Sequence, residues 1–253
     1  MNETFSVGSV LSTGFRIWAK NIIPFVLLTT VIYAPLIIWG VVAVQGEPGL
    51  DQLLRVLHFA RYSAAVILLL NIFVSAALTY GVVMELQGQR ASIGACVATG
   101  FARFFPVLGV ALLSALAVVG GMLALVVPGV IVTCMLYVAT PASVIEKPGV
   151  MGALKRSREL TAGRKGSIFG LLLILAVLGF GANKLVAAVF LPNAGDPAHL
   201  DETYHRLATY MYADLARAIV VGSIGAVMAA VAYYYLRNSK EGTTADELAK
   251  VFE

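Results

Sequence analysis

Six long apolar segments constrain this chain more than any other feature of its sequence. A helix of about 20 apolar residues crosses a hydrocarbon layer about 30 Å thick and satisfies its own backbone polar groups in lipid. Hydrophobic residues make up 59% of the 253 residues and charged residues only 13%, unlike a soluble domain. We therefore predict an all-α integral membrane protein, a single domain over residues 1–253, with spans at 22–44, 62–84, 104–127, 129–146, 167–191 and 216–237.

The third and fourth segments form one apolar block, residues 104–146, which only Pro128-Gly129 interrupts. A Pro-Gly pair favours a tight turn. We therefore predict two spans joined by a hairpin at this pair, and a re-entrant loop is the alternative.

Most basic residues lie on one side of the predicted membrane. Six spans place both chain ends on the same side, together with the loops after the second and fourth spans. That side carries thirteen of the 18 Lys and Arg residues, Lys184 falls within the fifth span, and the opposite side carries only Arg55, Arg61, Arg206 and Arg217. Because basic loops stay in the cytoplasm, this bias predicts a multi-pass protein of the bacterial inner membrane with cytoplasmic N and C termini.

A ten-residue stretch near the start of the chain recurs 86 residues later. Residues 6–15 read SVGSVLSTGF, and residues 92–101 read SIGACVATGF. On a helix, each copy places its apolar residues on one face, which is typical of an amphipathic helix in the membrane interface. The two copies predict helix-packing positions at Gly8, Gly14, Phe15, Gly94, Gly100 and Phe101.

A third and weaker copy begins at Met151-Gly152 and places Ser157 where the first two copies have threonine. Its aromatic position is Glu159, so the same packing face is not expected there. With this copy included, the chain divides into three units of a surface helix plus two spans. The units cover residues 4–86, 90–147 and 149–238, and a cytoplasmic tail follows at 239–253.

Several short segments resemble a known family. They are GSVLSTGF at 8–15, VPGV at 127–130, PASVIE at 141–146, ALKRSRELT at 153–161, and YYYLR with KEG at 233–242. With these segments the chain resembles the six-helix bacterial inner-membrane family related to the membrane domain attached to some glycerophosphoryl diester phosphodiesterases. The resemblance implies a fold more than a function, since such membrane domains are mostly uncharacterised. It also implies that any phosphodiesterase activity belongs to an attached catalytic domain, and we expect no such domain in this chain.

The clearest binding candidates are basic. Residues near the predicted inner surface are candidates for contacts with lipid headgroups, although the favoured interpretation is that they only set the topology. Lys184 is expected to extend its long side chain outward from the fifth span to phosphates or acidic loop residues, and a role in transport or binding is the alternative. The candidates are Lys155, Arg156, Arg158, Arg164, Lys165 and Lys184.

Three polar residues, Asn71, Ser75 and Thr79, recur at four-residue spacing along the second span. Such a stripe either lines a path for water or forms hydrogen bonds with a neighbouring helix. The second interpretation is favoured, because polar residues in membrane helices usually serve it.

No segment carries reaction chemistry: the sequence has no glycine-rich phosphate loop, no HExxH and no nucleophile elbow. We predict no catalytic residue, no metal and no cofactor. The favoured function is a non-enzymatic membrane protein that organises or binds lipid or scaffolds a partner, and a channel or transporter for a small solute or ion is the alternative. Membrane lipids are the expected partners, followed by a second copy of the chain or another membrane protein, and nothing indicates nucleic acid.

Overall fold

The computed structural model describes residues 5–46, 50–89, 91–190 and 200–251, and these residues form nine helices and no strand. The helices are α1 (Val7–Lys20), α2 (Ile22–Val44), α3 (Leu50–Leu86), α4 (Ile93–Ala124), α5 (Val126–Leu136), α6 (Ala139–Ile145), α7 (Gly149–Thr161), α8 (Lys165–Phe190) and α9 (Leu200–Val251).

Six segments of the described chain are long and apolar enough to cross a membrane: α2, α3, α4, α5 together with α6, α8, and residues 206–241 of α9. The prediction of an all-α, multi-pass membrane protein is therefore confirmed. The first span agrees at both ends with the predicted 22–44.

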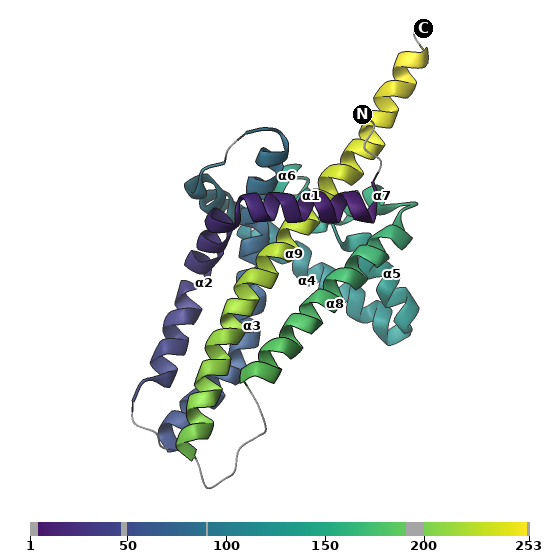
Figure 1. Cartoon of the computed structure of the whole chain (residues 1–253). Helices are drawn as coiled ribbons and strands as arrows, with labels where there is room; N and C mark the ends of the chain where they lie inside the picture. The colour runs from purple at the N-terminus through teal and green to yellow at the C-terminus, as the bar shows by residue number, and fades with distance from the viewer. Residues whose placement is uncertain (1–4, 47–49, 90, 191–199, 252–253) are drawn as a thin grey trace.

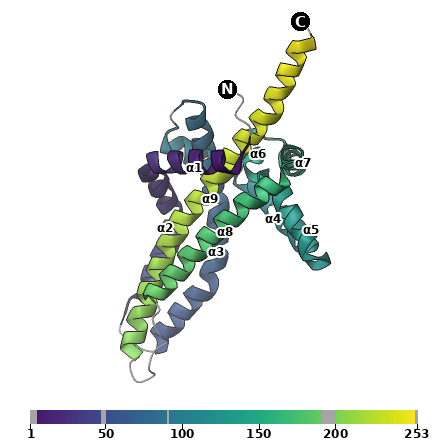
Figure 2. The same ribbon diagram turned by 45° about the vertical axis from the view of Figure 1, so that its right-hand side comes forward.

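Helix α9 is the centre of the bundle, and α1, α2, α3, α6, α7 and α8 all pack on it. Figures 1 and 2 show α1 lying across α9, whereas α2, α3 and α8 run alongside it. Small residues on α9, such as Ala226, Ala230 and Ala232, are buried and allow the neighbouring helices to approach closely.

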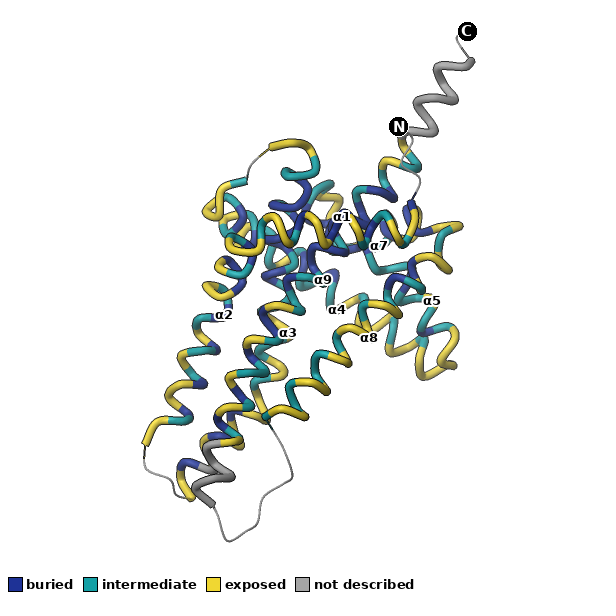
Figure 3. The backbone as a smooth tube through the Cα atoms, in the orientation of Figure 1, coloured by how far each residue is buried: buried dark blue, intermediate teal, exposed yellow. Residues whose placement is uncertain are grey.

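The core is concentrated at one end of the bundle. Buried residues gather where α1, α6 and α7 meet α9, hereafter the α1 end, as Figure 3 shows. The largest fully buried side chains there include Tyr233, Met228 and Leu236 of α9 and Leu160 of α7. By contrast, α8 and the far halves of α4 and α5 expose apolar side chains, as expected of surfaces in contact with lipid.

Asn21 separates α1 from α2. Its backbone and side-chain N–H groups both donate to the carbonyl of Ile17, at 3.0 Å each, which closes the end of α1. Pro24 follows in the first turn of α2, where its missing N–H costs no helical hydrogen bond. The chain therefore changes direction at Asn21, and α1 turns away from the span that follows it.

The second copy of the repeated sequence behaves differently, because α4 continues from Ile93 to Ala124 without a break. The predicted surface segment and the third span are thus one helix. Pro106 lies within this helix and does not end it.

The turn after α4 lies at Leu125, which has an extended backbone, and not at Pro128-Gly129. Pro128 instead occupies the first turn of α5. The two helices cross closely, since a Cβ added to Gly121 would lie 2.9 Å from the Cα of Gly129. The predicted hairpin is therefore present, three residues earlier than expected.

A second break separates α5 from α6 at Tyr137 and Val138. Pro141 cannot donate to the carbonyl four residues earlier, so a continuous helix is disfavoured here. The break frees the carbonyl of Met135, which accepts hydrogen bonds from Ser157 Oγ at 2.8 Å and Thr161 Oγ1 at 3.3 Å. These two hydroxyls attach α7 to the broken span.

The second and sixth spans belong to helices longer than predicted. Helix α3 begins at Leu50, and α9 joins the predicted span 216–237 to the residues before and after it in one helix. This extension brings Asp214, which precedes the predicted span, into the candidate span 206–241 together with Arg217.

Candidate functional site

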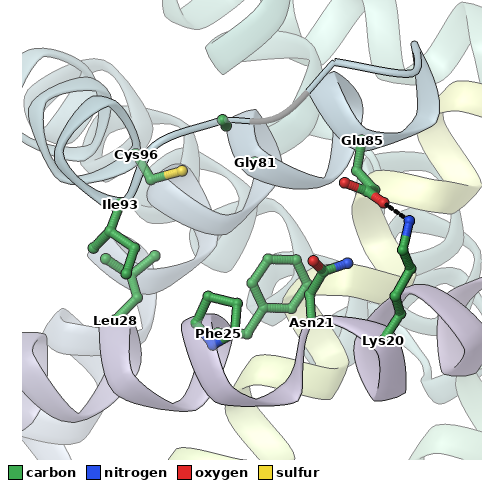
Figure 4. A pocket seen from close by; sticks show the side chains of 10 residues that line it. Lys20, Asn21, Phe25, Leu28, Gly81, Glu85, Ile93 and Cys96 are labelled. Carbon is green, nitrogen blue, oxygen red and sulfur yellow. Dashed lines mark hydrogen bonds and ion pairs between the residues drawn. The ribbon is translucent and has the colours of Figure 1, made fainter.

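A cavity of about 300 Å³ lies where the junction of α1 and α2 faces the end of α3 and the start of α4, hereafter the α1–α4 cavity (Figure 4). Phe25, Leu28 and Ile93 supply apolar wall. Lys20 and Glu85 also line it and form an ion pair, with 2.6 Å between Nζ and Oε1. The Lys20 side chain is 68% exposed and that of Glu85 only 19%, so the ammonium group lies at the mouth.

Both copies of the repeated sequence contribute to this cavity. Lys20 and Asn21 come from the end of the first copy's helix, and Ile93 and Cys96 come from the second copy. Gly81 of α3 allows α4 to approach, since an added Cβ would lie 3.1 Å from the Cys96 sulfur. A charged mouth over an apolar wall suits an amphiphile, and the volume lies at the lower limit of small-ligand pockets, about 300–1,000 Å³.

Equivalent positions of the two copies have the same helix cap. Ser6 Oγ accepts a hydrogen bond from the backbone N–H of Ser9 at 3.0 Å, and Ser92 Oγ accepts one from Ala95 at 3.1 Å. A serine at the N-cap satisfies one of the free N–H groups of the first turn. The repeated serine thus starts each helix.

The second glycine of each copy lies in close contact with a neighbouring helix. A Cβ on Gly14 would lie 2.4 Å from the sulfur of Met228 on α9, and one on Gly100 would lie 3.0 Å from the ring of Phe73 on α3. These two of the six predicted packing positions therefore lie against neighbouring helices.

The other four predicted packing positions are less closely packed than these two. No other residue approaches within 4 Å of a Cβ added at Gly94, and at Gly8 only Ser6 Oγ lies at that distance. Phe15 and Phe101 are 37% and 70% exposed. The Phe101 ring still packs edge-on against Phe73, with 4.6 Å between centroids.

The third copy keeps the first glycine of the repeat, as Gly152, but shares neither the cap nor the second glycine. Helix α7 begins after Pro148 with no side-chain cap, and Arg158 takes the place of Gly14 and Gly100. Ser157 also remains of the match, and its hydroxyl donates to the Met135 carbonyl of α5.

Five polar side chains form a closed ring at the α1 end, hereafter the polar ring: Glu146, Arg156, Tyr233, Arg237 and Glu241. Arg156 Nε donates to Glu146 at 2.7 and 2.9 Å, and Arg156 Nη2 donates to Glu241. Arg237 donates to Glu241 at 2.7 Å and to the Tyr233 hydroxyl at 3.5 Å. That hydroxyl donates to Glu146 at 2.7 Å and closes the ring.

The polar ring joins three helices. Glu146 follows the last residue of α6, Arg156 lies on α7, and the other three lie four residues apart on α9, so they share a face. Burial opposes the charge of Arg156, but hydrogen bonds and charges from Glu146 and Glu241 outweigh it and raise the guanidinium pKa. The hydrogen bonds of the ring connect α6 and α7 to α9. Because two cations balance two anions, the ring offers no net charge to a ligand.

The predicted headgroup contacts separate into two groups. Arg156 belongs to the polar ring, and Arg164 donates to the Phe5 carbonyl at 2.9 Å and to Ser239 Oγ at 2.8 Å. The exposed residues Lys155, Arg158 and Lys165 have no ion pair within the described parts of the chain. These three remain available at the surface near α7.

Lys184 lies on the exposed surface of α8, and its ammonium group is 5.4 Å from the ring centroid of Phe180. This cation–π contact is one turn away on the same helix. It places the charge of Lys184 on the outside of the bundle.

The polar stripe of α3 contacts α9 at Asn71. Asn71 lies against Gly222, since an added Cβ there would be 2.6 Å from Asn71 Oδ1. Thr79 is fully buried, and its hydroxyl has no hydrogen-bond partner among the described residues. Ser75 is half-buried between them along the helix. Asn71 therefore lies at a helix contact.

Sequence reasoning missed the polar ring and the Lys20–Glu85 pair. The ring residues lie within the resembling segments, but bonded partners in the ring are up to 87 positions apart in the chain. The described residues include no group of three or more His, Cys, Asp or Glu side chains that could hold a metal ion. Comparison of the chain with protein-family models, curated proteins and solved structures found no match.

Proposed function

We propose that the protein is a non-enzymatic protein of the bacterial inner membrane that binds or organises lipid, or scaffolds a partner, at its cytoplasmic face. The α1–α4 cavity carries this proposal. Lys20 meets the phosphate of a phospholipid at the mouth, and the upper part of an acyl chain lies on Phe25 and Leu28. Lys20 is suited to this role because its exposed side chain can exchange Glu85 for a phosphate.

The exposed cations near α7 support the placement of this site at the cytoplasmic face. Lys155, Arg158 and Lys165 each add about 1 kcal/mol of attraction to anionic headgroups when they lie close to the surface. Lys155 and Arg158 lie on α7 and Lys165 begins α8. Figure 1 shows α7 at the same end of the bundle as α1. This end faces the cytoplasm in our proposal, and the cytoplasmic tail follows it.

We further propose that the chain consists of repeated units and that α1 lies in the membrane interface. The shared serine caps and the paired contacts of Gly14 and Gly100 support two units, and the order of α7, α8 and α9 fits a third. The resemblance to the six-helix membrane family belongs to the same proposal. A second copy of the chain or another membrane protein is the next candidate partner, and the exposed apolar faces of α4, α5 and α8 leave room for it.

Native mass spectrometry of the full chain with phosphatidylglycerol tests the cavity. Lys20→Gln is expected to weaken binding about fivefold, the equivalent of about 1 kcal/mol for one lost basic contact. Ala91→Phe, which fills the cavity from the segment before α4, is expected to weaken it further.

The matched control is Arg16→Gln, an exposed cation on the same helix that does not line the cavity. It is expected to change binding by less than about twofold. Equal loss in the Lys20 and Arg16 variants would show that the surface attracts lipid only through its total charge, and the cavity would then have no part in it.

The channel or transporter remains the second candidate because of the polar stripe. The buried Thr79 hydroxyl, which has no hydrogen-bond partner in the described part of the chain, could bind a water molecule on such a path. Ion flux in proteoliposomes that Asn71→Leu abolishes would favour this function over lipid binding.

A further inference from the structure

A second cavity, of about 390 Å³, lies between α3 and α9 in the half of the bundle away from α1, hereafter the α3–α9 cavity. Phe59, Ile67 and Leu215 give it an apolar wall. The ion pair of Asp214 and Arg217 also lines it, with 2.6 Å between Nη2 and Oδ1. Its volume falls within the range of small-ligand pockets.

This ion pair lies level with the central part of α2. Gly40, one turn before the end of α2, faces Met211 of α9 closely enough that an added Cβ would lie 3.5 Å from its methyl group. Arg217 is six residues further toward the α1 end, or about 9 Å along the helix. On α2, the same distance from Gly40 leads to the level of Tyr33, halfway along that helix.

The charges of Asp214 and Arg217 balance each other, but not all of their hydrogen-bonding atoms have a partner. Arg217 Nε and Nη2 both meet the same oxygen, Asp214 Oδ1, at 2.7 and 2.6 Å. Within the described residues, the second carboxylate oxygen and Nη1 form no hydrogen bond. The two side chains are 28% and 21% exposed. One acceptor and one donor are therefore left without a partner among the described residues.

Charge decides which ligand fits. A single charge in the hydrocarbon layer is costly, and separating the pair would leave two charges without partners. A charged ligand would add an unbalanced charge to the hydrocarbon layer, because the ion pair is already neutral. A neutral group that donates to Oδ2 and accepts from Nη1 leaves the pair intact.

We propose that the α3–α9 cavity binds an uncharged amphiphile whose head carries hydroxyl groups, such as a monoacylglycerol. The head meets Asp214 and Arg217, with the hydroxyls of Ser63 and Tyr210 nearby in the lining, and the chain lies on the apolar wall. This site is separate from the α1–α4 cavity and takes a different class of lipid.

The test is native mass spectrometry of the full chain with three probes of equal chain length: 1-monooleoylglycerol, oleate and oleylamine. Monooleoylglycerol is expected to bind at least tenfold more tightly than either charged probe. Equal or tighter binding of oleate or oleylamine overturns the proposal, as does the absence of any monooleoylglycerol binding. This ranking needs no variant and so does not depend on how a variant folds.

Two neighbouring substitutions locate the site. Ala64→Phe places a ring in the cavity, whereas Ala65→Phe places one on the exposed surface of the same helix outside it. The first is expected to weaken monooleoylglycerol binding at least tenfold and the second less than twofold, and equal effects contradict the assignment. Lys20→Gln is expected to leave this binding unchanged, which separates the outcome from that of the α1–α4 cavity.

Discussion

Replacing Glu146 with alanine lowers the free energy of unfolding by about 3 kcal/mol in our account, because two charged-group hydrogen bonds are lost together. Glu146 accepts from Arg156 and from the Tyr233 hydroxyl, and its side chain is only 20% exposed. Without it, Arg156 keeps only Glu241, and α6 loses its connection through the polar ring to α7 and α9.

Equilibrium unfolding in mixed detergent micelles, followed by circular dichroism, measures this loss. Asp51→Ala is the control, since Asp51 is an exposed carboxylate outside the ion pairs of the described residues. Its loss is expected to cost less than about 1 kcal/mol, the contribution of an acidic residue in the first turn of a helix. Similar losses in the two variants would mean that the polar ring does not hold the helices together.

Gly121→Val is expected to destabilise the protein by about 2–3 kcal/mol through overpacking between α4 and α5. An added Cβ would lie 2.9 Å from the Cα of Gly129 and 3.1 Å from its nitrogen. These are backbone atoms, so rotation of a side chain cannot relieve the contact. The two helices must move apart at the tip of the hairpin.

Gly120→Val provides a matched control for this hairpin. The two glycines are adjacent in α4, so the change in helix propensity is the same, but a Cβ at Gly120 meets nothing within 4 Å. The difference between the variants in the same unfolding experiment isolates the crossing of α4 and α5. If both variants unfold alike, the close approach at Gly121 and Gly129 does not contribute to stability.

The sequence predicted the spans well where polar residues mark the ends. The first span is bounded by Lys20 and Asn21 on one side and Gln45 on the other, and α2 has the predicted limits. At Pro128 the signal was misread. Proline fits the first turn of a helix as well as a turn between helices, so it marks the start of α5 and the chain turns at Leu125.

The sequence did not predict the ion pair of the α3–α9 cavity, because α9 is longer than the predicted span. Asp214 lowers the hydropathy just before residue 216, where the predicted span begins. Arg217, three residues further along the same helix, balances its charge, so both residues fit within the candidate span 206–241.

The resembling segments turn out to be places where distant helices meet. Residues 141–146, 153–161 and 233–242 supply all five members of the polar ring. Residues 8–15 contain Gly14, which lies against Met228, and residues 127–130 contain Gly129, which crosses Gly121. A single sequence shows these motifs but not their partners, because the pairing depends on how the helices pack.

The central claim is that lipid occupies the α1–α4 cavity, and a structure of the full chain in nanodiscs of phosphatidylethanolamine and phosphatidylglycerol tests it most directly. We expect a lipid phosphate about 3 Å from Lys20 Nζ. Its acyl chain lies against Phe25 and Leu28. A cavity without lipid, together with a continuous file of water past Asn71 and Thr79 from one membrane face to the other, would contradict the claim and identify the protein as a channel.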